Sequence, residues 1–574
     1  MYSNKLKKYM REFNITNLKY FLGDNLVNML IEWTPDYENL FTKNKIVDMI
    51  ETIYGFDILK NKEFRKELLL KFSKDEILSF EHIFQIKSSD IHHIINEISN
   101  RNWGNNTITL QFLEILEIDK ESIIKEKTNE SEKEDIEAYD RFFELLDYQF
   151  IVKQKILNII NSDIPVPKTL IHMPTGTGKT KTTMHTIVNH YSFNLNKKGL
   201  IIWMAHTTEL LQQAYETLET TWKHIGMGSA TIYRLWENHN LQFEEEEEVN
   251  GFLLCGFQKL ISVMKNNPKL FDKLCKECVL VIVDEAHKAV AVETKKVIDE
   301  LIKQKQGMRN RALLGLTATP GRNTNDLGEN KSLVNMFENR IISIDTDILN
   351  AINLDKFKLN NSSPEKDVIR YLQDRKILAT IDRKKLSYDV SLSEDELNKL
   401  KIQATANGYE DFSKDFLKII GQNKKRNMKI LNELINLNMK KIPTIVFTCS
   451  VEQGRLLSSA LTLKGVKNGC VFGDMDSQQR QQNIKQFKDR FDDINILINY
   501  EVLTTGFDAT NIQCVFITRP TQSIVLYSQM IGRGLRGPKM GGNEKCLLID
   551  IEDNLDRYCS ESMAFNHFNN YWNN

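Results

Sequence analysis

The spacing of the hydrophobic residues changes along the chain. In the first part they recur every three or four positions, as they do from Ile46 to Tyr54, which is typical of helices that bury one face. Ser73 and Glu76 in SKDE have the spacing of a capping box at the start of a further helix. We therefore predict an all-helical domain over residues 1–138.

A polar segment separates this domain from the rest of the chain. Residues 119–137 read DKESIIKEKTNESEKEDIE, in which polar and charged side chains greatly outnumber apolar ones. Segments of this composition bury little apolar surface and usually serve as linkers. We expect a domain boundary near residue 138.

After this boundary, short runs of Ile, Val and Leu alternate with helical stretches, which is the pattern of parallel strands buried on both faces. Five runs begin near residues 170, 200, 252, 279 and 312, and five more near residues 444, 470, 494, 514 and 546. The sequence thus predicts an α/β chain with four parts. They are an all-α domain (1–138), a first parallel-sheet domain (139–345), a helix-rich connecting region without a usable motif (346–425) and a second parallel-sheet domain (426–574).

Composition indicates a folded, multidomain protein. The chain has 574 residues, of which 41% are hydrophobic, and this length exceeds one hydrophobic core. Its 76 basic and 77 acidic residues give a formal charge of −1. That balance excludes a bulk positive field, so any basic surface for nucleic acid must be local.

The sequence shows no sign of export or of a membrane partner. The N-terminal residues contain no apolar stretch of signal-peptide length, and no run is long enough to cross a membrane. The eight cysteines fit a reducing compartment, and the pair Cys275 and Cys278 has no second pair to complete a zinc site. We expect a cytoplasmic protein.

The segment LIHMPTGTGKT, Leu170 to Thr180, predicts a strand that leads through a glycine-containing loop into a helix. Gly176 and Gly178 allow backbone N–H groups to converge on phosphate oxygens, next to the positive end of the helix. Lys179 can reach the outer phosphates, and the Thr180 hydroxyl suits Mg²⁺. The nucleotide-binding residues would be Pro174, Thr175, Gly176, Thr177, Gly178, Lys179 and Thr180, and the alternative is a plain glycine turn.

Asp284 and Glu285 end a strongly apolar run in VLVIVDEAHKA. Ligands of open parallel sheets bind at the carboxyl ends of the strands, so these carboxylates should lie near the phosphate loop. There Asp284 can hold Mg²⁺, and Glu285 can orient and deprotonate an attacking water. Taken alone, the pair could equally be a solvated turn.

In this order, MPTGTGKT, DEAH at 284–287 and LTATP at 316–320 resemble motifs of the DEAH-type helicases and translocases of superfamily 2. Further motifs of the family fall in register: AHTTELLQQ at 205–213, LTTGFD at 503–508 and QMIGRGLRG at 529–537. The sequences of these motifs are most similar to those of the branch that contains the repair helicase RadD and the restriction subunits of type III enzymes. The resemblance covers about residues 139–560 and implies two tandem RecA-like domains that use ATP and Mg²⁺.

The resemblance assigns further roles around ATP. It implies that Gln149 reads the adenine, although the family's usual Arg before this motif is Asp147 here. Arg533 and Arg536 would act as arginine fingers that reach the γ-phosphate from the second domain.

The resemblance also implies residues that connect ATP to a nucleic-acid strand. Thr317 and Thr319 would couple the nucleotide state to domain closure, and His287 and Gln529 would bridge the two halves. Gly506 and Asp508 would face the ATP ribose and the strand backbone. The residues expected to contact strand phosphates, mostly without positive charge, are Thr207, Phe257, Gln258 and Thr448.

Three weaker features receive no function. The acidic run Glu244–Glu248 is typical of a solvated loop. His92 and His93 lack partners at metal spacing and are interpreted as ordinary helix residues. The C-terminal aromatic residues could stack on bases, but packing against the second domain is the more ordinary interpretation; they are Phe565, Phe568, Tyr571 and Trp572.

These expectations combine into an ATP-dependent motor on nucleic acid, in which the resemblance alone favours DNA over RNA. DNA repair and restriction or antiviral defence are equally open, and defence would need a separate effector such as a nuclease, docked through residues 1–138. The alternatives are a nucleic-acid-gated ATPase switch that recruits a partner through its N-terminal domain, and an RNA helicase.

Overall fold

The structure is a computed structural model. It describes residues 2–33, 41–88, 90–104, 106–118, 132–138, 144–244, 246–304, 310–321, 327–345, 348, 364–387, 411–489, 494–504, 506–507, 509–521 and 523–551. Within these ranges no helix is long and apolar enough to cross a membrane.

The first part of the chain is helical, as predicted. Its helices are α1 (Asn4–Glu12), α2 (Ile15–Leu22), α3 (Asp24–Trp33), α5 (Lys43–Tyr54), α6 (Lys62–Leu69), α7 (Lys74–Phe84), α8 (Ile91–Asn100) and α9 (Thr107–Ile115). The capping box at the start of α7 is confirmed: Ser73 and Glu76 each accept a hydrogen bond from the other's backbone N–H. His92 and His93 lie in α8.

The first sheet has eight strands in the order β1-β4-β5-β3-β6-β7-β2-β8. They are β1 (Lys133–Glu137), β2 (Lys168–His172), β3 (Leu200–Ala205), β4 (Ser229–Leu235), β5 (Gly251–Gly256), β6 (Cys278–Asp284), β7 (Ala312–Thr317) and β8 (Ile341–Ser343). All neighbours pair in parallel except β1 with β4. Every residue of β3, β6 and β7 is buried, which explains their uninterrupted apolar runs.

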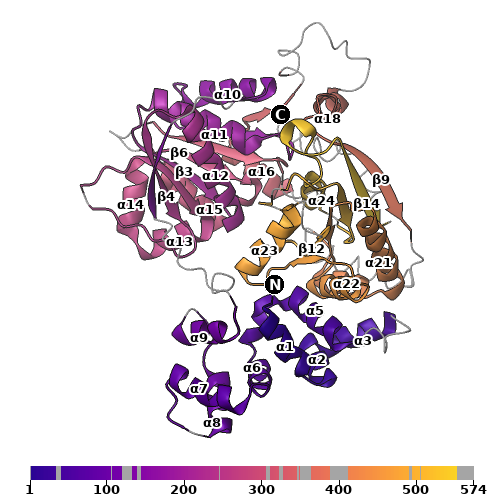
Figure 1. The fold of residues 1–574 in the computed structure, drawn as a ribbon. Coiled ribbons are helices and arrows are strands. Elements are labelled where there is room, and N and C mark those ends of the chain that lie inside the picture. Colours follow the sequence, from indigo (N-terminus) through magenta and orange to yellow (C-terminus); the bar gives the residue numbers. More distant parts are fainter. Residues whose placement is uncertain are drawn as a thin grey trace.

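Helices cover both faces of this sheet (Figure 1). One face packs against α10 (Asp147–Ile160), α11 (Lys179–Asn189) and α12 (Thr208–Ile225). The other packs against α13 (Phe257–Asn266), α14 (Pro268–Glu277), α15 (Val292–Ile302) and α16 (Leu327–Met336). Alternate residues of β3 belong to the two cores, with Ile201 and Trp203 in one and Ile202 and Met204 in the other.

The second sheet is fully parallel, with six strands in the order β11-β12-β10-β13-β14-β9. They are β9 (Thr380–Leu386), β10 (Thr444–Phe447), β11 (Gly469–Val471), β12 (Ile496–Asn499), β13 (Cys514–Ile517) and β14 (Lys545–Ile551). Its helices are α18 (Pro364–Asp374), α20 (Lys414–Gly421), α21 (Lys424–Met439), α22 (Val451–Leu463), α23 (Ser477–Lys488) and α24 (Ile524–Gly532). The predicted class, two parallel-sheet domains after a helical domain, is confirmed.

Two strands differ from the sequence prediction. β1 comes from the segment expected to be a linker, and β9 comes from the region expected to be helix-rich. Both are edge strands, in which only Ile136 of β1 is buried and no residue of β9 is. Edge strands keep polar side chains, so neither shows the apolar run that marks a central strand. The exact domain boundaries stay a prediction.

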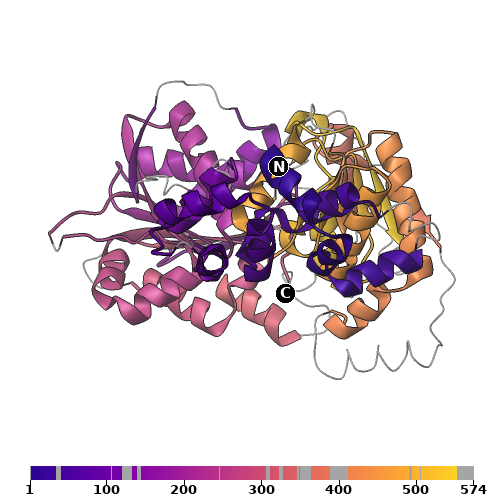
Figure 2. The same cartoon turned by 60° about the horizontal axis from the view of Figure 1, so that its bottom comes forward.

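The N-terminal helices pack against the second sheet domain. Helices α3 and α5 contact α22, and residues of both parts form one buried cluster, which includes Val47, Ile50, Leu456 and Leu457. In Figures 1 and 2 these helices lie along one side of the molecule, beneath the junction of the sheet domains. The N-terminal domain is thus an apolar-packed extension of the second sheet domain.

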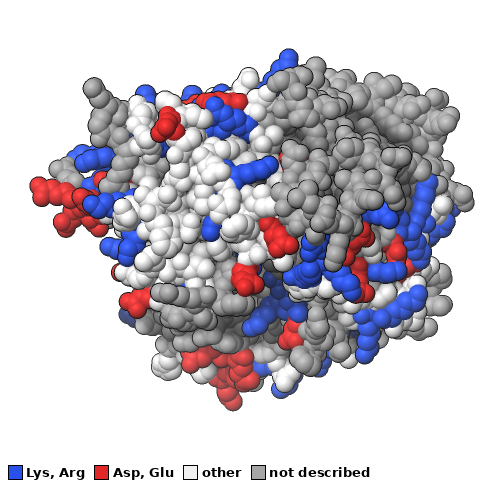
Figure 3. Space-filling view, turned by 90° about the horizontal axis from the view of Figure 1, so that it is seen from above, with Lys and Arg blue, Asp and Glu red and all other residues white. Residues whose placement is uncertain are grey.

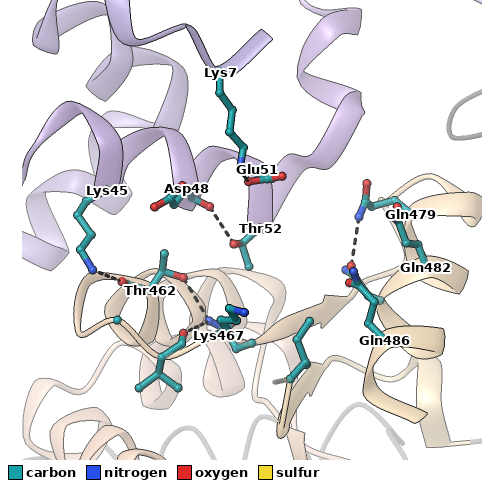
Figure 4. A pocket seen from close by; sticks show the side chains of 15 residues that line it. Lys7, Lys45, Asp48, Glu51, Thr52, Thr462, Lys467, Gln479, Gln482 and Gln486 are labelled. Atoms are coloured by element: carbon teal, nitrogen blue, oxygen red, sulfur yellow. Dashed lines mark hydrogen bonds and ion pairs between the residues drawn. The ribbon is translucent and has the colours of Figure 1, made fainter. Parts of the chain in front are cut away.

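A polar rim surrounds this apolar contact. Lys45 Nζ donates to the Thr462 carbonyl at 3.2 Å, and the Asp476 N–H donates to Asp57 Oδ2 at 3.0 Å. Beside them is a cavity of about 450 Å³, in which amide side chains of α23 face charged side chains of α1 and α5 (Figure 4). The contact therefore combines a continuous core with specific hydrogen bonds.

Charges are mixed on the molecular surface. Seen from above, Lys and Arg lie among Asp and Glu, and a wide uncharged area covers the side of the first sheet domain (Figure 3). This agrees with the formal charge of −1 and shows no field of a single sign over the described part of that face.

Candidate active site between the two sheet domains

The loop between β2 and α11 has the backbone of a phosphate-binding loop. Gly176 and Gly178 have φ angles of 86° and 81°, which side-chain-bearing residues rarely adopt. A Cβ at Gly178 would also lie 2.4 Å from Gln149 Nε2, so glycine is required there. Helix α11 begins at Lys179, and its free N–H groups point into the loop. The loop can hold an anion as the sequence predicted.

The loop is anchored from outside by α10. The Tyr148 hydroxyl and Gln149 Nε2 both donate to the Thr177 carbonyl, at 2.6 and 2.9 Å. Gln149 Oε1 accepts from the Leu146 N–H at 2.9 Å, and the side chain is buried. In this structure the Gln149 amide holds the loop, so its predicted reading of adenine stays a prediction.

The two carboxylates lie beside the loop, because β6 is separated from β2 only by β7. Lys179 Nζ is 4.0 Å from Asp284 Oδ1 and 3.7 Å from Glu285 Oε1. Glu285 has a φ angle of 49°, an uncommon left-handed conformation for a residue with a side chain. Strained backbone of this kind is concentrated at functional sites.

The environment shifts the pKa values of the two carboxyl groups in opposite directions. Burial outweighs the nearby Lys179 ammonium and, reinforced by the neighbouring Glu285 charge, raises the pKa of Asp284 above its usual value. Burial is the largest single influence on Glu285 and opposes its ionisation, but the surrounding basic groups, of which Lys179 contributes most, together outweigh burial and lower the pKa of that carboxyl. Asp284 is therefore short of positive charge, which is the electrostatic condition that a divalent cation would relieve.

Behind the carboxylates, a hydrogen-bonded group connects β6 to β7. His287 Nδ1 is 3.1 Å from Thr317 Oγ1, and the same hydroxyl donates to the Thr319 carbonyl at 2.7 Å. Because that hydroxyl has a single hydrogen, His287 Nδ1 is the donor in its contact. Burial lowers the pKa of His287 to about 3, so the ring is neutral at pH 7. The expected coupling residues are thus connected to each other.

The second sheet domain completes the site. A cavity of about 250 Å³ lies between the domains, and the residues from the second domain that line it are Gly506, Phe507, Gln529, Arg533, Arg536 and Met540. From the first domain come Pro174, Thr175, Gly176, Gly178, Lys179, Thr180, Lys181, Leu210, Gln213, Thr217, Asp284 and Glu285. The two halves of the motif series therefore meet at one cavity.

The two arginines differ in their contacts. Arg533 donates to the carbonyls of Phe507 at 2.5 Å and Thr504 at 2.8 Å, and so holds the loop after β12. Arg536 lies against the phosphate loop: a Cβ on Gly176 would be 3.3 Å from its Cγ. Arg536 is therefore the arginine that reaches the loop in this structure.

The lining of the cavity suits the phosphates of a nucleoside triphosphate with a divalent cation. Lys179 of the first sheet domain and Arg533 and Arg536 of the second supply positive charge. Glu285 Oε2 and Gln529 Nε2 are buried and have no hydrogen-bond partner among the described residues, which suits groups that await a ligand. Those residues contain no cluster of three acidic, His or Cys side chains for a metal, so Thr180 and Asp284 would share the cation with phosphate and water.

Some predicted residues lie elsewhere. Thr207 caps α12, and the exposed Gln258 lies in the first turn of α13; these helices follow the neighbouring strands β3 and β5. Phe257 and Thr448 are buried, so they can offer a strand only their backbone. Thr177 is buried beneath its loop. Asp508 and the four C-terminal aromatic residues lie outside the described residues, as does part of the run Glu244–Glu248.

The structure adds contacts that the motifs do not contain. Asp147 pairs with Arg375 at 3.7 Å, and Glu209 with Arg480 at 4.0 Å, each across the boundary between the sheet domains. No local sequence signal marks these pairs, because the partners are far apart in the chain.

Comparisons with known proteins agree with this geometry. The family model described as "Type III restriction enzyme, res subunit" matches residues 142–322, and "Helicase conserved C-terminal domain" matches residues 426–537. The ATP-dependent helicase IRC3 of Saccharomyces cerevisiae is 25% identical over 397 residues, which cover 66% of this chain and 48% of that protein. The mitochondrial ATP-dependent helicase irc3 of Schizosaccharomyces pombe is 30% identical over 141 residues, 25% of this chain and 23% of that protein.

Two further similarities were found. The ATP-dependent RNA helicase MJ0669 of Methanocaldococcus jannaschii is 32% identical over 97 residues, 17% of this chain and 26% of that protein. A fragment of an HsdR subunit of a type I restriction enzyme from Vibrio vulnificus has a TM-score of 0.45 and 18% identity, over 71% of this chain and 64% of that one. The chain spans less than half of each curated relative's length. Its two matched regions carry the two halves of the cavity, and together these domains support a superfamily 2 helicase related to the restriction-enzyme branch.

Proposed function

We propose that the chain is an ATP-driven motor that translocates along DNA, with ATP hydrolysed in the cavity between the two sheet domains. The observation that carries this proposal is the cavity itself, in which Lys179, Asp284 and Glu285 face Gln529, Arg533 and Arg536 of the other domain. A site divided in this way is complete only when the domains close, so hydrolysis and domain movement are coupled.

The residues have separate tasks in this reaction. The N–H groups of residues 176–180 and the Lys179 ammonium bind the phosphates, and Thr180 with Asp284 would hold Mg²⁺, which would neutralise phosphate charge. Glu285 accepts the proton of the attacking water, because the basic groups around it lower its pKa and keep the carboxylate ionised and able to accept. Arg536, aided by Arg533, stabilises the charge on the departing phosphate.

The remaining motif residues would connect the cavity to the strand. His287, Thr317 and Thr319 join the two central strands directly behind Glu285. Gly506 contacts the start of α12, where an added Cβ would lie 3.2 Å from Glu209 and Leu210. Thr207, Gln258 and the backbones of Phe257 and Thr448 would contact strand phosphates.

DNA is favoured over RNA by the match to the restriction-enzyme family. Relatives named as RNA helicases make RNA the second candidate track. For the pathway we propose DNA repair, or restriction or antiviral defence, with a separate effector such as a nuclease docked on the N-terminal helices. The protein would act in the cytoplasm.

A second function, an ATPase switch, is favoured by the packing of the N-terminal domain. Because these helices share a core with the second sheet domain, each closure would carry them along and change the surface they offer to a partner. Such a switch needs no processive movement.

A streptavidin-displacement assay separates the two functions. The intact chain is given ATP and a DNA whose end carries streptavidin bound to biotin, on either the 3′ or the 5′ end, or an RNA of the same sequence. A motor displaces streptavidin from one end in an ATP-dependent manner. ATP hydrolysis without displacement on any substrate would leave the switch as the function.

A further inference from the structure

His206 lies between the two parts of the site that a motor must connect. Strand β3 is the neighbour of β5 and β6, so the residue after β3 lies between the residues that follow the other two strands. The His206 ring centroid is 6.3 Å from that of Phe257, and its Nε2 is 2.8 Å from Lys288 Nζ. One side chain thus contacts both the predicted strand-binding edge and the segment that follows DEAH.

The chemistry of this contact fixes the state of the ring. An ammonium group only donates hydrogen bonds, so His206 Nε2 is the acceptor and the ring proton is on Nδ1. Burial, and next the Lys288 charge, lowers the pKa of His206 to about 4, which agrees with a neutral ring at pH 7.

Lys288 belongs to the turn that carries the catalytic carboxylate. The Lys288 N–H donates to the Glu285 carbonyl at 2.9 Å and closes the turn in which Glu285 has its left-handed φ angle of 49°. A strained conformation persists only when surrounding contacts hold it. The backbone hydrogen bond of Lys288 is a contact of this kind, and its side-chain hydrogen bond to His206 ties the turn to the end of β3.

We propose that the hydrogen bond from Lys288 to His206 transmits strand binding to Glu285. Engagement of a strand at Thr207 and at the start of α13 moves the end of β3, and through Lys288 it sets the turn that aims the Glu285 carboxylate. This inference rests on the proposed function, since it names how the strand regulates that site. His206 and Lys288 are positioning residues, and neither lines the nucleotide cavity.

Coupling between two sites is reciprocal in binding free energy. The link between His206 and Lys288 acts on the rate of hydrolysis, to which this reciprocity does not apply. Loss of the bond should therefore weaken the stimulation of hydrolysis and leave each site able to bind its own ligand.

The variants His206→Phe and Lys288→Met test this link in the full chain. Phe keeps an aromatic ring beside Phe257 but cannot accept the hydrogen bond, and Met keeps the length of Lys without its charge. We expect nucleic-acid-stimulated hydrolysis to fall roughly tenfold in each, with unstimulated hydrolysis and strand affinity unchanged within about twofold. The double variant should be no worse than either single one, since both remove the same bond.

Conservative variants provide the matched controls. His206→Gln retains an acceptor near the position of Nε2, and Lys288→Arg retains a donor, so both should recover most of the stimulation. Purely structural residues would behave differently: stimulated and unstimulated rates would fall together, and the Gln variant would recover neither.

The outcomes are distinct from those of the proposed function. If a nucleic acid stimulates hydrolysis equally in the wild type and in His206→Phe, the link is overturned and the proposed motor is not affected. Wild-type protein that no nucleic acid stimulates would overturn the link and the proposed function together. Additive losses in the double variant would show that the two side chains act through separate contacts.

Discussion

Two parts of the candidate site are held by neighbours outside the phosphate loop and the DEAH segment. The phosphate loop is fixed by the Tyr148 hydroxyl, and the turn of Glu285 by Lys288. Local spacing predicted which residues lie around the phosphates, since a strand, a glycine loop and a helix N-terminus can meet in few ways. It could not predict these supports, because their contacts depend on strand order and not on sequence distance.

The two arginines should have different effects when removed. Arg536→Ala should leave ATP binding within about threefold of wild type and lower turnover at least about a hundredfold, since an arginine finger acts mainly on the transition state. Arg533→Ala should lower turnover and also release the carbonyls of Thr504 and Phe507, so amide hydrogen exchange in this loop should increase.

Steady-state kinetics with direct ATP-binding measurements, together with hydrogen exchange, checks both variants. Loss of ATP binding in Arg536→Ala would mean that this arginine is structural, and unchanged exchange in Arg533→Ala would contradict its role as a support of the loop.

Three buried histidines and the half-buried His206 predict how the stability of the first sheet domain depends on pH. Burial lowers the pKa of His172 and His287 to about 3, and that of His190 and His206 to about 4. In the unfolded chain these histidines bind a proton near pH 6.5, whereas in the folded chain they stay neutral to a lower pH. The neutral rings therefore contribute fully to the free energy of unfolding above pH 6.5, and this contribution is lost as pH falls toward 4.

Urea unfolding at pH 7.5, 6.5 and 5.5 measures this dependence. We expect the urea concentration at the midpoint of unfolding to decrease as the pH is lowered. The decrease should be smaller in His190→Phe, which removes one of the four titrating groups. A midpoint that rises between pH 7.5 and 5.5 would contradict the assigned burial.

At the scale of elements, the apolar runs predicted ten strands correctly, and the four others escaped for physical reasons. Strands β1 and β9 are polar edges, β8 has three residues, and β4 contains the buried polar residue Arg234 within its run. Arg234 is compensated by Glu134 of β1, whose Oε2 accepts its hydrogen bond at 2.8 Å. The pattern of hydrophobic residues cannot reveal such a strand, because the hydrogen-bond partner of its buried polar residue lies a hundred residues away in the chain.

The N-terminal helices should stay with the second sheet domain when the chain is cut. The shared core makes separation expose apolar surface on both sides, at about 25 cal/mol for each Å². A protease site inserted between residues 119 and 131, and then cleaved, should leave two fragments that co-elute in size-exclusion chromatography.

A matched control places a charge in the contact. Leu457→Glu lies in the shared core on α22, and it should release the N-terminal fragment after cleavage. Separate elution of the wild-type fragments would show that the helices form an independent, mobile domain, which would also remove the structural support for the switch.

At the scale of the whole molecule, three units meet around α23. Its first turn contacts the N-terminal domain through Asp476 and Asp57, and its Arg480 pairs with Glu209 of the first sheet domain. One buried cluster also extends across both sheet domains. Closure around a nucleotide must therefore rearrange α12, α23 and the N-terminal helices together, which is the property required of a motor that converts hydrolysis into movement.

The most direct test of the account is steady-state ATP hydrolysis with and without single-stranded DNA, duplex DNA, forked DNA and RNA. We predict Mg²⁺-dependent hydrolysis that one DNA form stimulates. Lys179→Ala should lower it about a thousandfold or more, and Glu285→Gln should abolish the stimulation while ATP still binds. Wild-type turnover in Lys179→Ala or Glu285→Gln would contradict the assigned site, and hydrolysis that none of the nucleic acids changes would contradict the motor.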